Sequence, residues 1–223
     1  MELIFKDFSG FALCRFYNNR FSIGFDSLSY TFKTGTYILK GQISDGGWAI
    51  SYALAPLVKK DVHIFNNELY TSRFYLNGKE VILKELQKIS IYLGNHTVNR
   101  YAPCNMSGYK QIQKAIKKGT SKYSLDDLIT MFCLSQDRIH KPVCHTSGEA
   151  WLITAAIGLA MNKQIFCMPW QSNHIVSTKH AMFEIISKNV KRHNGILLIP
   201  AETTTFLEGF ADEVIDLRSP LSF

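Results

Sequence analysis

The chain has 223 residues, of which 46% are hydrophobic, so it is long and apolar enough to form one large domain with a substantial core. Its 25 basic and 18 acidic side chains give a formal net charge of +7, which makes nucleic acid and anionic membrane surfaces the partner classes to weigh. The five cysteines are widely spaced and form no C-x-x-C pair, which argues against a disulfide scaffold. No apolar run reaches about 18 residues, which argues against a membrane-spanning chain. No signal-peptide core is present, which argues against export.

The first part of the sequence predicts an antiparallel sheet. Apolar and polar residues alternate over residues 2–8, 11–16, 21–25 and 28–32, and Asn18-Asn19 is a typical hairpin turn. After a second turn at Gly35, another strand is predicted over residues 36–40.

A glycine-containing loop follows that strand and leads into an apolar helix predicted to begin near Trp48. The loop has the outline of the phosphate-binding P-loop, G-x-x-x-x-G-K-[ST], with Gly41 and Gly46 at the two glycine positions. Gly47 stands at the lysine position, and Trp48 stands at the Ser/Thr position. The loop therefore has the P-loop outline without the groups that bind phosphate and metal.

Two polar residues of the loop, Ser44 and Asp45, are the expected caps of the helix. Asp45 also brings a carboxylate into a loop that would hold an anion. Two like charges about 4 Å apart repel by roughly 1–4 kcal/mol at effective dielectric constants of about 80 to 20. The carboxylate is also able to take the backbone N–H groups that would otherwise favour an anion.

The middle of the chain changes character along its length. Short strands are predicted over residues 61–65, 68–75 and 80–83, with Asn77-Gly78 as a tight turn, and a buried strand over 89–93 that ends at Gly94. Helical patterns follow over residues 110–118 and from Ser124 to residue 133 or 134, where Ser124 and Asp127 have nearly capping-box spacing.

The last third alternates helices with buried strands. Helices are predicted over residues 150–161, 180–192 and 206–211, and strands over 164–168, 196–199 and 214–217. The first of these helices is apolar on nearly every face, so it should be buried all round. This alternation favours a parallel α/β core.

The order of these features resembles the ATP-binding cassette domain of ABC transporters along nearly the whole chain. Residues 145–149 lie at the family's signature, 165–170 at its Walker B strand, 196–202 at its switch strand and 206–217 at its closing segment. The resemblance implies a single α/β, P-loop NTPase-like domain over residues 1–223 with a mixed or parallel core sheet. It places an antiparallel β-subdomain at about 1–35, the core at 36–94 and 160–223, and a helical subdomain with the signature at 95–159.

In that family the P-loop lysine neutralises phosphate charge, and the Ser/Thr hydroxyl holds Mg²⁺. The resemblance places Pro169 and Trp170 where the Walker B Asp and Glu belong, Ala201 at the switch histidine and Gly94 at the metal-linking glutamine. The indole of Trp48 is expected to fill phosphate space. The altered P-loop comprises Gly41, Ser44, Asp45, Gly46, Gly47, Trp48 and Ala49, whereas the best-retained motif is the signature, Thr146, Ser147, Gly148 and Glu149; Phe16 and Tyr17 are candidates for stacking on adenine.

These changes together predict a subunit with no catalytic residues, because no group remains to stabilise a phosphoryl transition state. No cofactor is expected, ATP and Mg²⁺ bind weakly or not at all, and the histidine spacing indicates no metal site. The implied partners are an active ABC ATPase subunit, whose ATP site the signature would complete, and a membrane permease, with a homodimer as a further arrangement. The expected location is cytoplasmic, at the membrane if a permease binds the chain.

Two other functions stay open. The emptied loop is a candidate site for another ligand or protein in a stand-alone binding module. The net charge alone raises nucleic-acid binding, although the basic clusters at 110–122 and 188–193 carry no recognisable binding motif and are better interpreted as solvated helix faces.

Overall fold

The computed structural model describes residues 1–16, 19–55, 62–64, 71–94, 105–120, 122–146 and 148–217. An antiparallel sheet is built on the long hairpin of β1 (Glu2–Phe16) and β2 (Asn19–Lys33). The other partners of β1 are β4 (Val62–Ile64) and β5 (Arg73–Leu76), and β6 (Lys79–Val81) pairs with β5 through the predicted turn at Asn77-Gly78.

The sequence predicted two short strands where each strand of the hairpin is continuous. The pairing of β1 with β2 shifts register between Phe5 and Gly10, and Asp7 and Ser27 have positive φ there. A bulge of this kind breaks the apolar–polar alternation without ending the strand. The interruption in the alternation, where we predicted the end of one strand and the start of the next, is therefore a bulge within each strand.

A second sheet has the strand order β10-β3-β9-β8-β7 and is wholly parallel. Successive side chains of its strands point into two different apolar clusters: Ile38 faces one, while Tyr37 and Leu39 face the other. Both faces of this sheet are therefore buried, as the sequence predicted. The strands are β3 (Gly35–Lys40), β7 (Ser90–Tyr92), β8 (Ile165–Cys167), β9 (Ile196–Ala201) and β10 (Glu213–Asp216).

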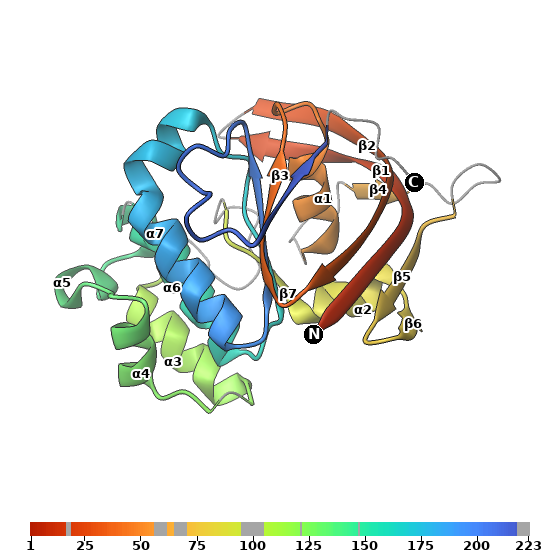
Figure 1. Ribbon diagram of the computed structural model, residues 1–223. Helices are drawn as coiled ribbons and strands as arrows, with labels where there is room; N and C mark the ends of the chain where they lie inside the picture. Colours follow the sequence, from red (N-terminus) through yellow and green to blue (C-terminus); the bar gives the residue numbers. More distant parts are fainter. Residues whose placement is uncertain are drawn as a thin grey trace.

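The helices divide between the two faces of the parallel sheet (Figure 1). α1 (Gly47–Leu54) lies between the two sheets with α2 (Leu83–Ile89) near its end. The opposite face is covered by α6 (Glu149–Ala160) and α7 (Asn173–Arg192). Beyond these two helices lies a helical block made of α3 (Gly108–Lys118), α4 (Leu125–Met131) and α5 (Gln136–Ile139). The 3₁₀ turn η1 follows at Val143–His145. No helix among the described residues is long and apolar enough to cross a membrane.

Three predicted elements were wrong in detail. Part of the predicted strand over 80–83 leads into α2, whose first turn is capped by the Glu85 carboxylate accepting from the Ile82 N–H at 3.0 Å. α7 begins seven residues earlier than predicted, through a kink at Lys179 (φ −120°) that the periodicity did not signal. Residues 206–211 form turns and no helix, because the chain must return there to β3.

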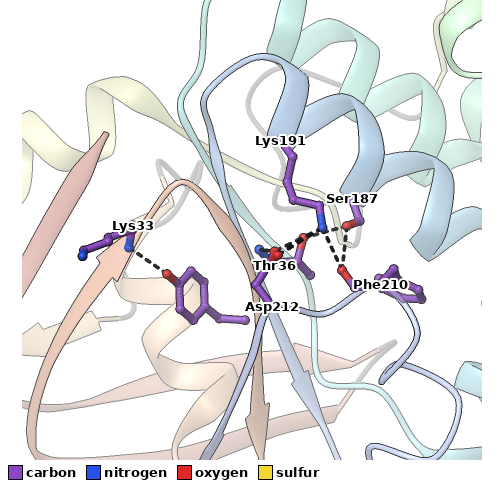
Figure 2. Close-up of polar contacts among 7 residues, drawn as sticks. Lys33, Thr36, Ser187, Lys191, Phe210 and Asp212 are labelled. Carbon is purple, nitrogen blue, oxygen red and sulfur yellow. Dashed lines mark hydrogen bonds and ion pairs between the residues drawn. The ribbon is translucent and has the colours of Figure 1, made fainter.

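That return is fixed by a small polar network (Figure 2). The Asp212 carboxylate accepts from the Thr36 N–H at 2.8 Å and lies 3.2 Å from the Lys191 ammonium. The Thr36 hydroxyl is 2.8 Å from the Ser187 hydroxyl, and both residues are fully buried. These contacts tie the chain before β10 to the start of β3 and to the end of α7, so they set where β3 delivers the loop that follows it.

Candidate functional site

The candidate site lies at the carboxyl ends of the parallel strands, where open α/β sheets bind their ligands. The loop of residues 41–46 joins β3 to α1 as predicted, with α1 beginning at Gly47. Its first residue contacts the end of the adjacent strand β9 and the segment after β8: the Gly41 N–H donates to the Ala201 carbonyl at 2.9 Å, and its carbonyl accepts from the Trp170 indole N–H at 3.0 Å. The fold thus gathers three of the predicted motif positions around one loop.

Two glycines are required by the path of this loop. A Cβ at Gly41 would lie 2.8 Å from the Cβ of Asp45, because that side chain folds back over the start of the loop. Gly46 has a φ of +89°, and a Cβ there would meet the Cβ of Phe25 at 2.6 Å and the Gly24 carbonyl at 2.8 Å. The loop is therefore closed on one side by β2, and only glycine fits the left-handed turn into α1.

Asp45 does not cap α1, contrary to the prediction, and neither does Ser44. The N-cap residue is Gly46, with no side-chain cap. The Asp45 carboxylate accepts from the Gln42 N–H at 2.6 Å and from the Ser44 hydroxyl at 3.4 Å, while the Asp45 N–H donates to the Gln42 carbonyl at 3.0 Å. The carboxylate therefore binds one of the loop's own amides, three residues before it in the chain, and carries its negative charge where a phosphate would need positive charge.

The position of the P-loop lysine is crowded. A Cβ at Gly47 would lie 3.1 Å from the Pro200 Cβ and 3.1 Å from the Leu217 side chain, with Leu39 at 3.4 Å. A side chain at this position would require these neighbours to shift by a few tenths of an ångström. Gly47 itself supplies no charge to the loop.

The Trp48 indole turns away from the loop and into the apolar layer between the sheets. It is 2% exposed, meets Tyr52 one helical turn further along α1 at 6.1 Å between ring centroids, and donates its N–H to the Tyr92 hydroxyl at 2.9 Å. Burial raises the pKa of Tyr92 well above its usual range, so its hydroxyl stays neutral. We expected the indole to fill phosphate space; its described contacts lie in the core.

Tyr92 also connects this indole to the Gly94 position. A Cβ at Gly94 would lie 2.4 Å from the Tyr92 ring, so the ring and a side chain at residue 94 cannot both be accommodated as they stand. Tyr52 and Tyr92 pack edge to face at 5.1 Å. The positions that would carry the metal-binding hydroxyl and glutamine are thus joined by one buried aromatic cluster of Trp48, Tyr52 and Tyr92.

Sequence reasoning missed both tyrosines of this cluster. Tyr92 is 44 positions from Trp48 in sequence, and nothing in the sequence pattern pairs the two. The one signal in the sequence is Trp48 itself, because a buried tryptophan needs a hydrogen-bond partner for its N–H. It predicts that a polar partner exists without identifying it.

The residues that the sequence resemblance places at the Walker B Asp and Glu and at the switch histidine carry no carboxylate or imidazole. Pro169 and Trp170 are half-buried after β8, and Ala201 is fully buried in β9. Gln171 continues the pairing with β9, its N–H donating to the Pro200 carbonyl at 2.8 Å. Within the described ranges no three His, Cys, Asp or Glu side chains are grouped as metal ligands.

The signature-like turn lies on the other side of the parallel sheet and is covered by protein. Thr146 is fully buried and donates its hydroxyl to the Val143 carbonyl at 2.7 Å. Glu149 is 8% exposed, and its carboxylate lies 3.3 Å from the Arg138 guanidinium. A Cβ at Gly148 would lie 2.4 Å from the Met182 methyl group of α7. Ser147, the Phe16 side chain and Tyr17 lie outside the described residues.

A strand–loop–helix unit at the end of a parallel sheet, an antiparallel layer over its helix and a helical block beside it together make up an α/β fold of the P-loop type. Comparison with solved structures identifies the known fold that the chain resembles. A candidate ABC transporter ATP-binding protein of Pyrococcus furiosus matches with a TM-score of 0.66 at 13% identity, covering 98% of each chain. The ATP-binding cassette MJ0796, solved as a dimer with ADP and Pi, matches with a TM-score of 0.64 at 11% identity, covering 96% of this chain and 93% of that one.

CbiO1 of Clostridium perfringens, part of the ABC transporter complex CbiONQ, matches with a TM-score of 0.61 at 10% identity, over 96% of this chain and 84% of that one. No protein-family model matches the sequence, and no curated protein matches it significantly. The chain therefore has the fold of an ABC ATP-binding cassette over nearly its whole length.

Proposed function

We propose that this chain is an ABC-cassette-like subunit that does not hydrolyse ATP and that serves as a structural or regulatory partner in a transporter assembly. The observation that carries the proposal is the buried pair of Trp48 and Tyr92. At the position where a hydroxyl would hold Mg²⁺, an indole donates its N–H to a buried phenol. A metal-binding group is absent there, and the side chain in its place is needed by the core.

The neighbouring groups support the same conclusion. Gly47 supplies no positive charge, and Asp45 supplies a negative charge bound to the loop's own amide. Stabilising the charge of a transferred phosphoryl group requires cations and positioned donors. The described loop offers the opposite charge, so hydrolysis lacks its largest favourable contribution.

Calorimetric titration of the purified chain with Mg-ATP tests this proposal, with an active cassette titrated in parallel. We expect no saturable heat in the micromolar range and no phosphate release above the buffer rate. The double variant Gly47→Lys/Trp48→Ser should restore neither, because the Asp45 carboxylate still places a negative charge in the loop. Micromolar affinity or steady hydrolysis by the unaltered chain would overturn the proposal.

The partner role draws on the relatives of known structure, which include a dimeric cassette and a subunit of a transporter complex. We infer an active cassette subunit, a permease or a second copy of this chain as the partner. Light scattering of the chain alone, and after co-expression with an active cassette and a permease, distinguishes these arrangements. A chain that stays monomeric in every combination contradicts the partner role.

Completion of a partner's ATP site by the signature-like turn stays a prediction. It requires Met182 to leave Gly148, because the described groups of that turn face protein. In an assembled complex, Gly148→Asp should abolish the partner's hydrolysis if the turn contacts its nucleotide. Unchanged hydrolysis in an intact complex would leave this chain a purely structural role.

The alternative of a stand-alone module that uses the emptied loop for another ligand has weaker support. Such a module needs groups available beside Asp45 and Trp48, whereas the indole is 2% exposed and the carboxylate bonds to the Gln42 amide. Two surface hollows formed by described residues lie elsewhere, one beside β5, β6 and α2 and one beside the start of α3.

A further inference from the structure

The exposed face of α3 consists of lysines alone. Gly108, Gln111, Ile112 and Ala115 form its buried face, and the remaining residues Tyr109, Gln113 and Ile116 are half-buried. The exposed residues are Lys110, Lys114, Lys117 and Lys118, here called the lysine stripe. The helix contains no acidic residue, and none of these lysines has an ion pair within the described part of the chain.

The other surface helices differ from α3 in this respect. Among the exposed residues of α4 are Asp126 and Asp127, and α2 mixes the exposed Lys84, Glu85 and Lys88. Mixed charge of this kind is the usual composition of a solvated helix face. The sequence alone favoured that interpretation for α3 as well, but the exposure pattern separates α3 from the other helices.

Folding stability does not account for the stripe. Lys117 and Lys118 lie in the last turn, where cations complement the helix dipole. Lys110 lies in the first turn, where a cation is unfavourable. The pairs Lys110/Lys114 and Lys114/Lys118 are four apart, and like charges at that spacing destabilise a helix. An arrangement that costs stability on an exposed surface points to binding.

Basic groups continue beyond both ends of the helix. At its beginning, the exposed His140 stacks on Tyr109 at 4.7 Å between ring centroids. Beyond its end, Lys122 is a further exposed cation. The lysine stripe itself extends from Lys110 to Lys118, nine residues of helix whose first and last are about 12 Å apart.

We propose that the lysine stripe is a docking surface for an anionic lipid bilayer, binding acidic phospholipid headgroups at the membrane surface. Lysine ammonium groups are compact, mobile point charges that need no fixed partner geometry, which suits a fluid anionic surface. Specific protein interfaces have an apolar or aromatic centre depleted in lysine, and the exposed positions of α3 include neither. Single-strand binders interleave aromatic side chains with the basic ones for base stacking, and the stripe has none. This inference does not depend on whether the chain binds ATP.

Sedimentation of the full chain with phosphatidylcholine vesicles, with and without phosphatidylserine, tests the proposal. We expect binding only to the vesicles with phosphatidylserine, and weaker binding as salt rises. The variant Lys110→Gln/Lys114→Gln/Lys117→Gln should bind about 100-fold more weakly, since each lysine near such a surface contributes about fivefold. Its melting temperature should not fall, because like-charge contacts are relieved.

The matched control is Lys79→Gln/Lys84→Gln/Lys88→Gln, which removes the same charge from exposed lysines elsewhere on the chain. Its binding should change by less than about threefold if the stripe, and not net charge, is responsible. Equal losses in the two variants would overturn the proposal, as would equal binding to both kinds of vesicle. Stripe-dependent binding of DNA or RNA without binding to phosphatidylserine vesicles would also overturn it and would assign the surface to nucleic acid.

Discussion

Two turns of this chain, the loop of residues 41–46 and the signature-like turn at Thr146–Glu149, differ in opposite ways from the motifs that they resemble. The loop lacks the lysine and hydroxyl of a P-loop, yet it still joins a parallel strand to a buried helix at the carboxyl end of the sheet. The signature-like turn keeps more of its residue types, yet Thr146 is fully buried and Met182 lies over Gly148.

The difference shows that the backbone path of a motif and the exposure of its residues have separate physical causes. The path of the loop depends on Gly41 and Gly46, two glycines that are visible in the sequence, where a Cβ would meet Asp45 and the β2 residues Gly24 and Phe25. The exposure of the signature-like turn depends on α7, an element 24 or more residues further along. The residue types of a motif therefore predict the backbone path of that motif better than they predict whether a ligand can reach it.

The largest effect on this comparison is expected from Trp48→Ser, which introduces a hydroxyl at the Ser/Thr position of the P-loop pattern. We expect a loss of about 3–5 kcal/mol in the free energy of unfolding, because a large aromatic side chain leaves the core. ATP binding should not appear. Urea unfolding and calorimetric titration measure the two effects.

The control for this variant is Trp170→Phe, which removes an indole N–H that donates to Gly41 but keeps a half-buried ring. It should cost about 1 kcal/mol, the ordinary value of one hydrogen bond. Similar losses for the two variants would show that Trp48 is not the core element we describe.

Gly46→Ala should cost about 3 kcal/mol, from the strain of a left-handed residue and from the clash with β2. Gly78→Ala separates the two causes, since Gly78 also has a positive φ (+78°) but a Cβ there meets nothing within 4 Å. That variant should lose only about 1 kcal/mol. Thermal unfolding of both variants measures the contact between the loop and β2, and equal losses would mean that β2 does not hold the loop.

Met182→Ala should uncover the signature-like turn at a cost of about 1–2 kcal/mol for a half-buried side chain. Hydrogen exchange should become faster at the Glu149 and Trp151 amides, which bond to the Thr146 and Gly148 carbonyls. Met161→Ala, a half-buried methionine at the other end of α6, should leave those amides unchanged. Unchanged exchange in Met182→Ala would show that α7 does not cover the turn.

The smallest effect is expected from the ion pairs beside the two turns. Arg138→Ala should cost about 1–2 kcal/mol, because it leaves the Glu149 carboxylate only 11% exposed without its cation. Lys40→Ala at the base of the loop should cost about 0.5 kcal/mol, because Lys40 and its partner Asp216 are each 32% exposed. Urea unfolding ranks the two, and the reverse order would contradict the burial of the signature-like turn.

Local sequence patterns determined most of the elements of this fold. Alternation predicted the antiparallel strands, continuous apolar runs predicted the buried parallel strands, and the apolar helix of residues 150–161 is α6 within one residue at each end. Ser124 and Asp127 form the predicted capping box of α4. These signals are local because backbone conformation and burial periodicity depend on residues a few positions apart.

Tertiary structure alone decided what the motif residues touch. The sequence showed that Trp48 and Asp45 replace the expected chemistry, but it did not show that the indole would bond to Tyr92 or that the carboxylate would bind its own loop. The sequence also favoured a solvated helix face for the basic cluster at 110–122, whereas the packing of α3 shows that lysines alone occupy the exposed face of that helix. Such contacts depend on which distant elements pack together. The sequence does not show them because side chains that meet across a core are paired by shape and burial and have no fixed spacing along the chain.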